Sequence, residues 1–178
     1  MRVIGGEFRS RRLKSVPGMA TRPTPDRLRE ALFNVLAPRL AGCTFLDAYA
    51  GCGAVGIEAL SRGASRVILI EKSRPAIQVI EENLEALGIR DAVSVIRGAV
   101  LAHLARLEAD IVFLDPPYDL VSEYEQVLGL LGRNPPASVI AQHTVRLKLE
   151  EAYGSLRLAR ALKQGDNVLS FFEPASRD

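Results

Sequence analysis

The clearest chemistry in this 178-residue chain lies at positions 115–118, which read Asp-Pro-Pro-Tyr and directly follow an apolar run, 109–114, that predicts a buried strand. The Asp115 carboxylate and the Pro116 carbonyl can each accept one N–H of a planar amino group, which favours a pyramidal nitrogen whose lone pair faces a methyl donor. Tyr118 can stack on a base turned out of its helix. The pattern indicates alkylation of an amino group on a nucleobase, with an ordinary strand-ending turn as the competing interpretation.

A second group of residues lies between a predicted strand, 44–49, and a predicted helix, 55–61. Asp47 and Ala48 precede a glycine turn that contains Gly51 and Gly53. Open parallel sheets bind ligands at this point of the fold, and glycine lets the backbone pass close to the ligand.

Two carboxylates indicate which cofactor binds at this turn. Glu71 ends the next predicted strand, 20 residues beyond Gly51, where an acidic side chain can take both hydroxyls of a ribose. This spacing fits a dinucleotide or S-adenosylmethionine. A carboxylate at Asp47 repels a pyrophosphate but can hold the ammonium group of methionine, and hydride transfer leaves residues 115–118 without a role. We therefore expect S-adenosylmethionine as donor and S-adenosylhomocysteine as product.

The charge of the chain is uneven along its length. Residues 1–30 contain eight Lys and Arg against three Asp and Glu, whereas the rest of the chain has an acidic excess. Such asymmetry favours a nucleic acid bound through its phosphates, with a solvated surface as the plainer alternative. The candidate phosphate contacts are Arg9, Arg11, Arg12, Arg22, Arg27 and Arg29.

Strand-like and helix-like segments alternate along most of the chain, which is typical of an α/β fold with a parallel sheet. Two late strands, 155–162 and 167–173, are linked by a Gly165-Asp166 turn, so the sheet is expected to finish antiparallel. A short hairpin across Gly5-Gly6 is expected at the front. The chain is thus divided into a basic arm, 1–22, and a compact domain, 23–178. The other expected strands are 66–71, 92–96, 111–114 and 138–142; the other expected helices run from Pro25 onward, through 77–87, over 100–107 and over 124–131.

Length and composition further restrict the class of protein. A chain of this length buries roughly 70% of its unfolded surface as one domain. It has no apolar run of the ~20 residues that a membrane span needs, and its N-terminus lacks a signal-peptide core, so a cytoplasmic location is expected. Cys43 and Cys52 have no second pair, and both histidines are distant, so neither a metal site nor a disulfide is expected.

Taken together, these motifs resemble the RsmD family of bacterial 16S rRNA (guanine-N2) methyltransferases over nearly the whole chain. The resemblance implies a Rossmann-like class I methyltransferase with a mostly parallel seven-stranded sheet and an antiparallel last strand. It further implies S-adenosylmethionine as donor and the exocyclic N2 of a guanine in 16S rRNA as acceptor, within an assembling 30S subunit. Nothing in the sequence requires more than a monomer. The residues that carry the resemblance are 2–6, 9, 11–13, 22–24, 26–34, 47–56, 58–64, 71 and 115–118.

Three departures from the family pattern affect these expectations. Cys52 stands in the glycine turn where the family usually has Ser or Thr, and a thiol is a weaker hydrogen-bond partner. Gly98 stands where similar enzymes tend to have Asp or Asn facing the adenine, so backbone groups near Ala99 would replace that side chain. The stretch 142–146 matches the family poorly, and we assign no role to His143.

Two other functions stay open. N6-adenine methylation of DNA uses the same acidic-Pro-Pro-aromatic loop, although this chain lacks a large target-recognition domain. A ribosome assembly factor that binds RNA and retains a degenerate pocket is the alternative outside the enzymes, and Gly98 gives it slight support. Binding of S-adenosylmethionine separates the assembly factor from the enzymes.

Overall fold

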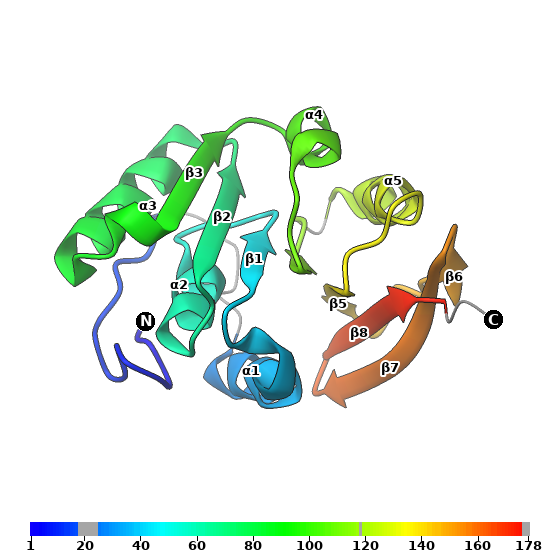
Figure 1. The fold of residues 1–178 in the computed structure, drawn as a ribbon, viewed down its shortest axis with the longest axis horizontal. Coiled ribbons are helices and arrows are strands. Elements are labelled where there is room, and N and C mark those ends of the chain that lie inside the picture. Colours follow the sequence, from blue (N-terminus) through cyan, green and yellow to red (C-terminus); the bar gives the residue numbers. More distant parts are fainter. Residues whose placement is uncertain (18–24, 118, 176–178) are drawn as a thin grey trace.

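The computed structural model describes residues 1–17, 25–117 and 119–175. Helices and strands alternate through most of this range, as the sequence predicts (Figure 1). None of the helices in these ranges is long and apolar enough to cross a membrane. The elements are α1 (Asp26–Leu40), β1 (Thr44–Asp47), α2 (Ala54–Ser61), β2 (Arg66–Glu71), α3 (Arg74–Leu87), β3 (Val93–Arg97), α4 (Val100–His103), β4 (Ile111–Leu114), α5 (Val121–Leu131), β5 (Ser138–Thr144), β6 (Ala152–Tyr153), β7 (Leu156–Gln164) and β8 (Asn167–Pro174), with short 3₁₀ turns at Arg90–Ala92 and Leu104–Arg106.

The strands form one sheet in the order β3-β2-β1-β4-β5-β8-β7-β6. Strands β1 to β5 pair in parallel, and β8 pairs antiparallel with both β5 and β7, which confirms the expected antiparallel finish. The sheet has eight strands in the described part of the chain, so the expected number of seven is wrong. The additional strand, β6, has two residues, Ala152 and Tyr153, which is too short to show an alternating pattern in the sequence.

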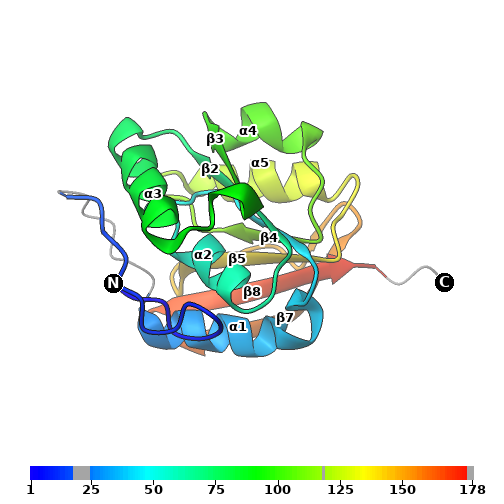
Figure 2. The ribbon, with the colours of Figure 1, turned by 60° about the vertical axis from the view of Figure 1, so that its left-hand side comes forward.

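The sheet is covered on both faces. Helices α1, α2 and α3 pack against one face and α4 and α5 against the other, which Figure 2 shows with α1 and α5 on opposite sides of the sheet. Successive residues of a strand point to opposite faces, so Phe45 joins the first core and Leu46 the second. This packing explains why β4 and the middle of β2 are apolar and buried on both faces, because a strand between two helix layers has no face in water.

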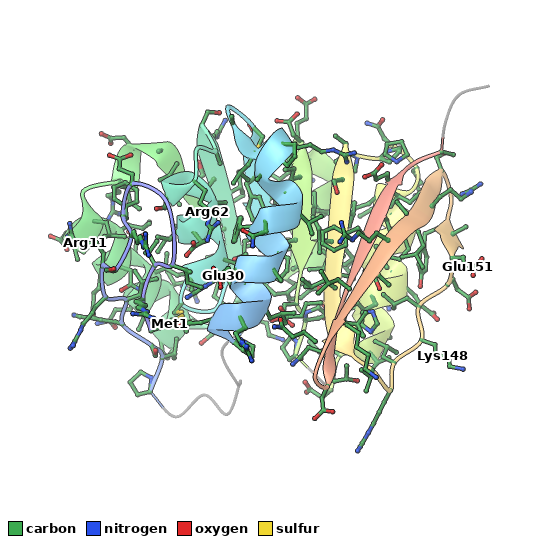
Figure 3. The ribbon with its side chains drawn as sticks, turned by 90° about the horizontal axis from the view of Figure 1, so that it is seen from below. Met1, Arg11, Glu30, Arg62, Lys148 and Glu151 are labelled. Carbon is green, nitrogen blue, oxygen red and sulfur yellow. The ribbon has the colours of Figure 1, made fainter. Side chains whose placement is uncertain are left out.

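The N-terminal segment, residues 1–17, folds back on itself as a short antiparallel pair: Arg2 bridges Arg12, the Val3 N–H donates to the Arg11 carbonyl, and the Leu13 N–H donates to the Met1 carbonyl, each at 2.9 Å. Its loop is held by α2: the Glu58 carboxylate accepts the Ile4 and Gly5 N–H groups at 2.8 Å each. Because these amides donate to a helix side chain, they do not donate to a neighbouring strand. In Figure 3, Arg11 lies at the outer side of this segment, across the molecule from Lys148 and Glu151.

Candidate active site

A cavity of about 310 Å³ opens at the carboxyl ends of the central strands. The strand order reverses between β1 and β4, and this is the place where open α/β sheets bind ligands. Most of the residues predicted to bind a cofactor or an amino group line this one cavity. They are Asp47, Ala48, Gly51, Glu71, Gly98, Ala99, Asp115 and Pro116.

Asp47, the last residue of β1, is almost fully buried. Its Oδ2 atom accepts the Gly56 N–H at 3.3 Å, and its Oδ1 atom has no hydrogen-bond partner among the described residues. Burial, with a smaller contribution from the nearby Asp115 charge, raises the pKa of Asp47 to about 7. A buried carboxylate oxygen without a donor is the group that a bound cation would satisfy.

Glu71 holds the glycine turn. One carboxylate oxygen accepts the Gly51 N–H and the other accepts the Ser73 N–H, each at 2.8 Å. The 20-residue spacing from Gly51 to Glu71 therefore corresponds to a direct contact. Gly53, also predicted to approach the cofactor, is not among the cavity-lining residues; it lies buried at the start of α2 with φ +81°, where its role is to shape the turn.

Asp115 follows β4 at the cavity wall, next to Pro116. Its Oδ2 atom accepts a hydrogen bond of 3.1 Å from the side-chain amide of Gln142 on β5. Burial raises the pKa of Asp115 to about 7. His143, which follows Gln142, is buried, and its Nε2 atom lies 2.8 Å from Ser170 Oγ in a hydrogen bond.

A contact between Tyr49 and Glu123 spans the cavity wall, and the sequence reasoning did not find it. The Tyr49 hydroxyl donates to the Glu123 carboxylate, joining the loop after β1 to the first turn of α5. Burial, together with this hydrogen bond, raises the pKa of Tyr49. Gln142 was also missed, because its link to Asp115 depends on which strands are neighbours, and sequence spacing does not give that order.

Gly98 lines the cavity with a positive φ of +152°. A Cβ built on it would lie 2.3 Å from His103 Nε2. The positive φ therefore favours glycine, and any other side chain would also require the His103 ring to move. An Asp or Asn, which similar enzymes tend to carry at this place, does not fit beside His103 as it stands.

The candidate RNA contacts divide into two groups. Arg9, Arg11, Arg12 and Arg27 are exposed. Arg29 has 0% of its surface exposed, so its prediction as a phosphate contact is wrong. The signal for burial was present in the sequence, because Arg29 shares a helix face with Leu32 and Phe33 at spacings of three and four. Two predicted site residues, Arg22 and Tyr118, lie outside the described residues.

A family model described as Conserved hypothetical protein 95 matches residues 1–173 of the chain. The chain is 42% identical over 136 residues to ribosomal RNA small subunit methyltransferase D of Escherichia coli (strain K12), covering 75% of this chain and 68% of the relative. The chain belongs to the RsmD family.

Two further proteins support the RsmD assignment. The putative rRNA methyltransferase YlbH of Bacillus subtilis (strain 168) is 35% identical over 174 residues, covering 90% of this chain and 91% of that protein. The solved structure of the putative methyltransferase yhhF from Escherichia coli aligns with a TM-score of 0.86 at 31% identity, covering 99% of both chains. The protein is thus an RsmD-family methyltransferase with a Rossmann-like class I fold, as the sequence resemblance implied.

Proposed function

We propose that this protein transfers a methyl group from S-adenosylmethionine to the exocyclic N2 of a guanine in 16S rRNA of the small ribosomal subunit. One observation carries the proposal: Asp115 and Pro116 line the same cavity as Asp47, Gly51 and Glu71. Acceptors suited to an amino group therefore lie beside groups suited to the methyl donor. The rRNA substrate is supported by the names of the relatives.

The residues of the cavity fit S-adenosylmethionine, which supplies an electrophilic methyl group on its sulfonium. Asp47 Oδ1, which lacks a partner among the described residues, would hold the ammonium group. Glu71 would accept hydrogen bonds from the ribose hydroxyls through lone pairs that the Gly51 and Ser73 amides leave open. Backbone groups of Gly98 and Ala99 would meet the adenine, because Gly98 has no side chain to do so.

Asp115 and the Pro116 carbonyl would each accept one N–H of the guanine amine and aim its lone pair at the methyl group. Gln142 engages Asp115 Oδ2, so Oδ1 is the oxygen that we propose accepts the guanine N–H. As the N–CH₃ bond formed and the S–CH₃ bond broke to leave S-adenosylhomocysteine, positive charge would develop on nitrogen, and the Asp115 carboxylate, held in a water-poor cavity, would stabilise that charge. With its pKa near 7, Asp115 can then take the proton that leaves. Tyr118 is proposed to stack on the flipped guanine.

The basic arm, 1–22, is proposed to bind the rRNA backbone next to the methyltransferase domain, 23–178. Arg9, Arg11 and Arg12 are exposed on the described part of the arm, and Arg27 is exposed on α1, so all four suit phosphate contacts. Arg22 stays in the proposal on sequence grounds alone. An assembling 30S subunit in the cytoplasm is the proposed substrate particle, and the enzyme is proposed to act as a monomer.

The test is transfer of tritiated methyl groups to three acceptors: naked 16S rRNA, small subunits lacking the modification, and duplex DNA. We expect label in rRNA, on one guanine, and none in DNA. Label on adenine of DNA would support N6-adenine methylation. Absence of S-adenosylmethionine binding by a folded protein in calorimetry would support the assembly factor.

A further inference from the structure

Arg29 is a buried guanidinium with incomplete hydrogen bonding. Its Nη2 atom donates to the Arg2 carbonyl at 2.6 Å and to Asp26 Oδ1 at 3.1 Å, and its Nε atom lies 3.9 Å from Glu58 Oε2. No exposed surface remains on the side chain. Within the described part of the chain, Nε and Nη1 have no hydrogen-bond partner.

Burying the Arg29 guanidinium in this way destabilises the folded protein when no ligand is bound. A guanidinium has five N–H donors and no acceptors, and a buried donor without a partner loses its hydration with nothing in return. Burial lowers the pKa of Arg29, and the charges of Glu58 and Asp26 oppose that change. Buried polar groups are nearly always paired in folded proteins, so a cationic side chain left in this state indicates an anionic partner that the described residues do not supply.

Arg29 also lines the cavity that contains the proposed cofactor residues, together with Met1 and Cys52. Burial raises the pKa of the Cys52 thiol, and smaller contributions come from the charges of Asp47, which raises the pKa, and of Arg29, which lowers it. Cys52 therefore lies close to both groups, at the end of the cavity beside the glycine turn. Both Asp47 and Arg29 line the cavity, and each has a buried atom without a hydrogen-bond partner among the described residues: Asp47 Oδ1 lacks a donor and Arg29 Nη1 lacks an acceptor.

Two unsatisfied groups of opposite sign match the two charges of an α-amino acid. We propose that Arg29 binds the carboxylate of the methionyl part of S-adenosylmethionine through Nη1, while Asp47 holds the ammonium group. The assignment rests on the proposed use of this donor. It gives Arg29, which is too deeply buried to reach an RNA phosphate, a function in cofactor selection.

A purely structural role for Arg29 is the competing explanation. Its contacts with Arg2 and Glu58 join the N-terminal segment to α1 and α2. Arg62 offers a matched control, because its Nε atom bonds the same Glu58 carboxylate at 2.7 Å and it does not line the cavity. Loss of Arg62 therefore loosens the same cluster without removing the proposed carboxylate contact.

The test is calorimetric binding of S-adenosylmethionine and of its decarboxylated analogue to the wild type, Arg29→Met and Arg62→Met. We expect the wild type to prefer the carboxylated ligand by about ten- to hundredfold, as for a hydrogen bond to a charged group. Arg62→Met should keep this preference, and Arg29→Met should bind both ligands with equal affinity. A structural role predicts that Arg29→Met weakens both ligands by the same factor, and an unchanged preference would overturn the proposal.

Thermal unfolding of each variant accompanies the titrations. If Arg29→Met does not fold, Arg29→Lys replaces it in the titrations. Lysine keeps the charge but lacks the planar fork, so it should reduce the preference for the carboxylated ligand. An unchanged preference in Arg29→Lys, or no preference in the wild type, would also contradict the assignment. Failure of the wild type to bind either ligand would refute the use of S-adenosylmethionine itself, which separates the two failures.

Discussion

Gln142 donates a hydrogen bond from its side-chain amide to Asp115 Oδ2 at 3.1 Å. The contact is possible because β4 and β5 are parallel neighbours with Leu114 opposite Ala141, so the next residue of each strand lies side by side. The Tyr124 hydroxyl donates to the Gln142 carbonyl at 2.5 Å and fixes this end of β5. Asp115 is thereby held in one orientation by a neutral donor.

Replacing Gln142 by Met, which has a similar size but no donor, should therefore reduce the rate of methyl transfer. We expect kcat to fall about tenfold, the loss of roughly one hydrogen bond to a charged group. Affinity for S-adenosylmethionine should stay the same. Without the donor the pKa of Asp115 rises further, so the acidic limb of the pH–rate profile should move to higher pH.

The double variant supplies the control. In an Asp115→Asn background, Gln142→Met should have little additional effect, because its action runs through the carboxylate. Independent, additive losses would show that Gln142 acts elsewhere.

The order of the elements and the cofactor turn could be predicted from sequence because both are local. Apolar runs bounded by glycine turns placed β1, β2 and β4, and the spacing from Gly51 to Glu71 gave a contact that the structure contains. Contacts that depend on sheet order, such as that between Gln142 and Asp115, have no signal in spacing. The prediction for Arg29 failed for a different reason: it considered the charge of the side chain and not the apolar helix face on which the residue lies.

Asp47→Asn should stabilise the cofactor-free protein at neutral and alkaline pH. Burial raises the pKa of Asp47 to about 7, whereas an unfolded Asp titrates near pH 4, about its ordinary value. The stability linked to this group is therefore complete below about pH 4 and is lost as the pH rises through 7.

Asparagine removes this loss, so the melting temperature of Asp47→Asn should exceed that of the wild type at pH 8 by about 2–4 °C for each kcal/mol gained. At pH 5 the difference should shrink. Part of the pH dependence will remain because Asp115 has a similarly raised pKa. Cofactor binding should be strongly weakened in the same variant. Identical melting curves at pH 8 would contradict the buried, costly carboxylate described above.

Gly98→Asp, which restores the residue common in similar enzymes, should weaken cofactor binding and lower stability. Its φ of +152° is strained for any other residue by about 1–3 kcal/mol, and the His103 ring occupies the space of the new side chain. Calorimetry and thermal unfolding measure both effects. Adding His103→Ala should recover part of the loss, and a stable, tighter-binding Gly98→Asp single variant would show that the site can accept an aspartate.

Removal of Arg9, Arg11 and Arg12 together should weaken RNA binding mostly at low salt. These side chains are exposed, and each lost phosphate contact should reduce the slope of log affinity against log salt by about 0.7–0.9. The matched control removes Arg146, which is exposed in the turn after β5, and Arg160 and Lys163, which are exposed on β7. If the two triple variants had equal slopes of log affinity against log salt, the RNA would not bind at Arg9, Arg11 and Arg12.

The most direct test of the central claim compares the wild type with Asp115→Asn. Both proteins are incubated with S-adenosylmethionine and unmodified small subunits, the rRNA is digested to nucleosides, and N2-methylguanosine is quantified by mass spectrometry. The account predicts that Asp115→Asn binds S-adenosylmethionine as the wild type does while formation of N2-methylguanosine collapses. Formation of N2-methylguanosine by Asp115→Asn at the wild-type rate would contradict it.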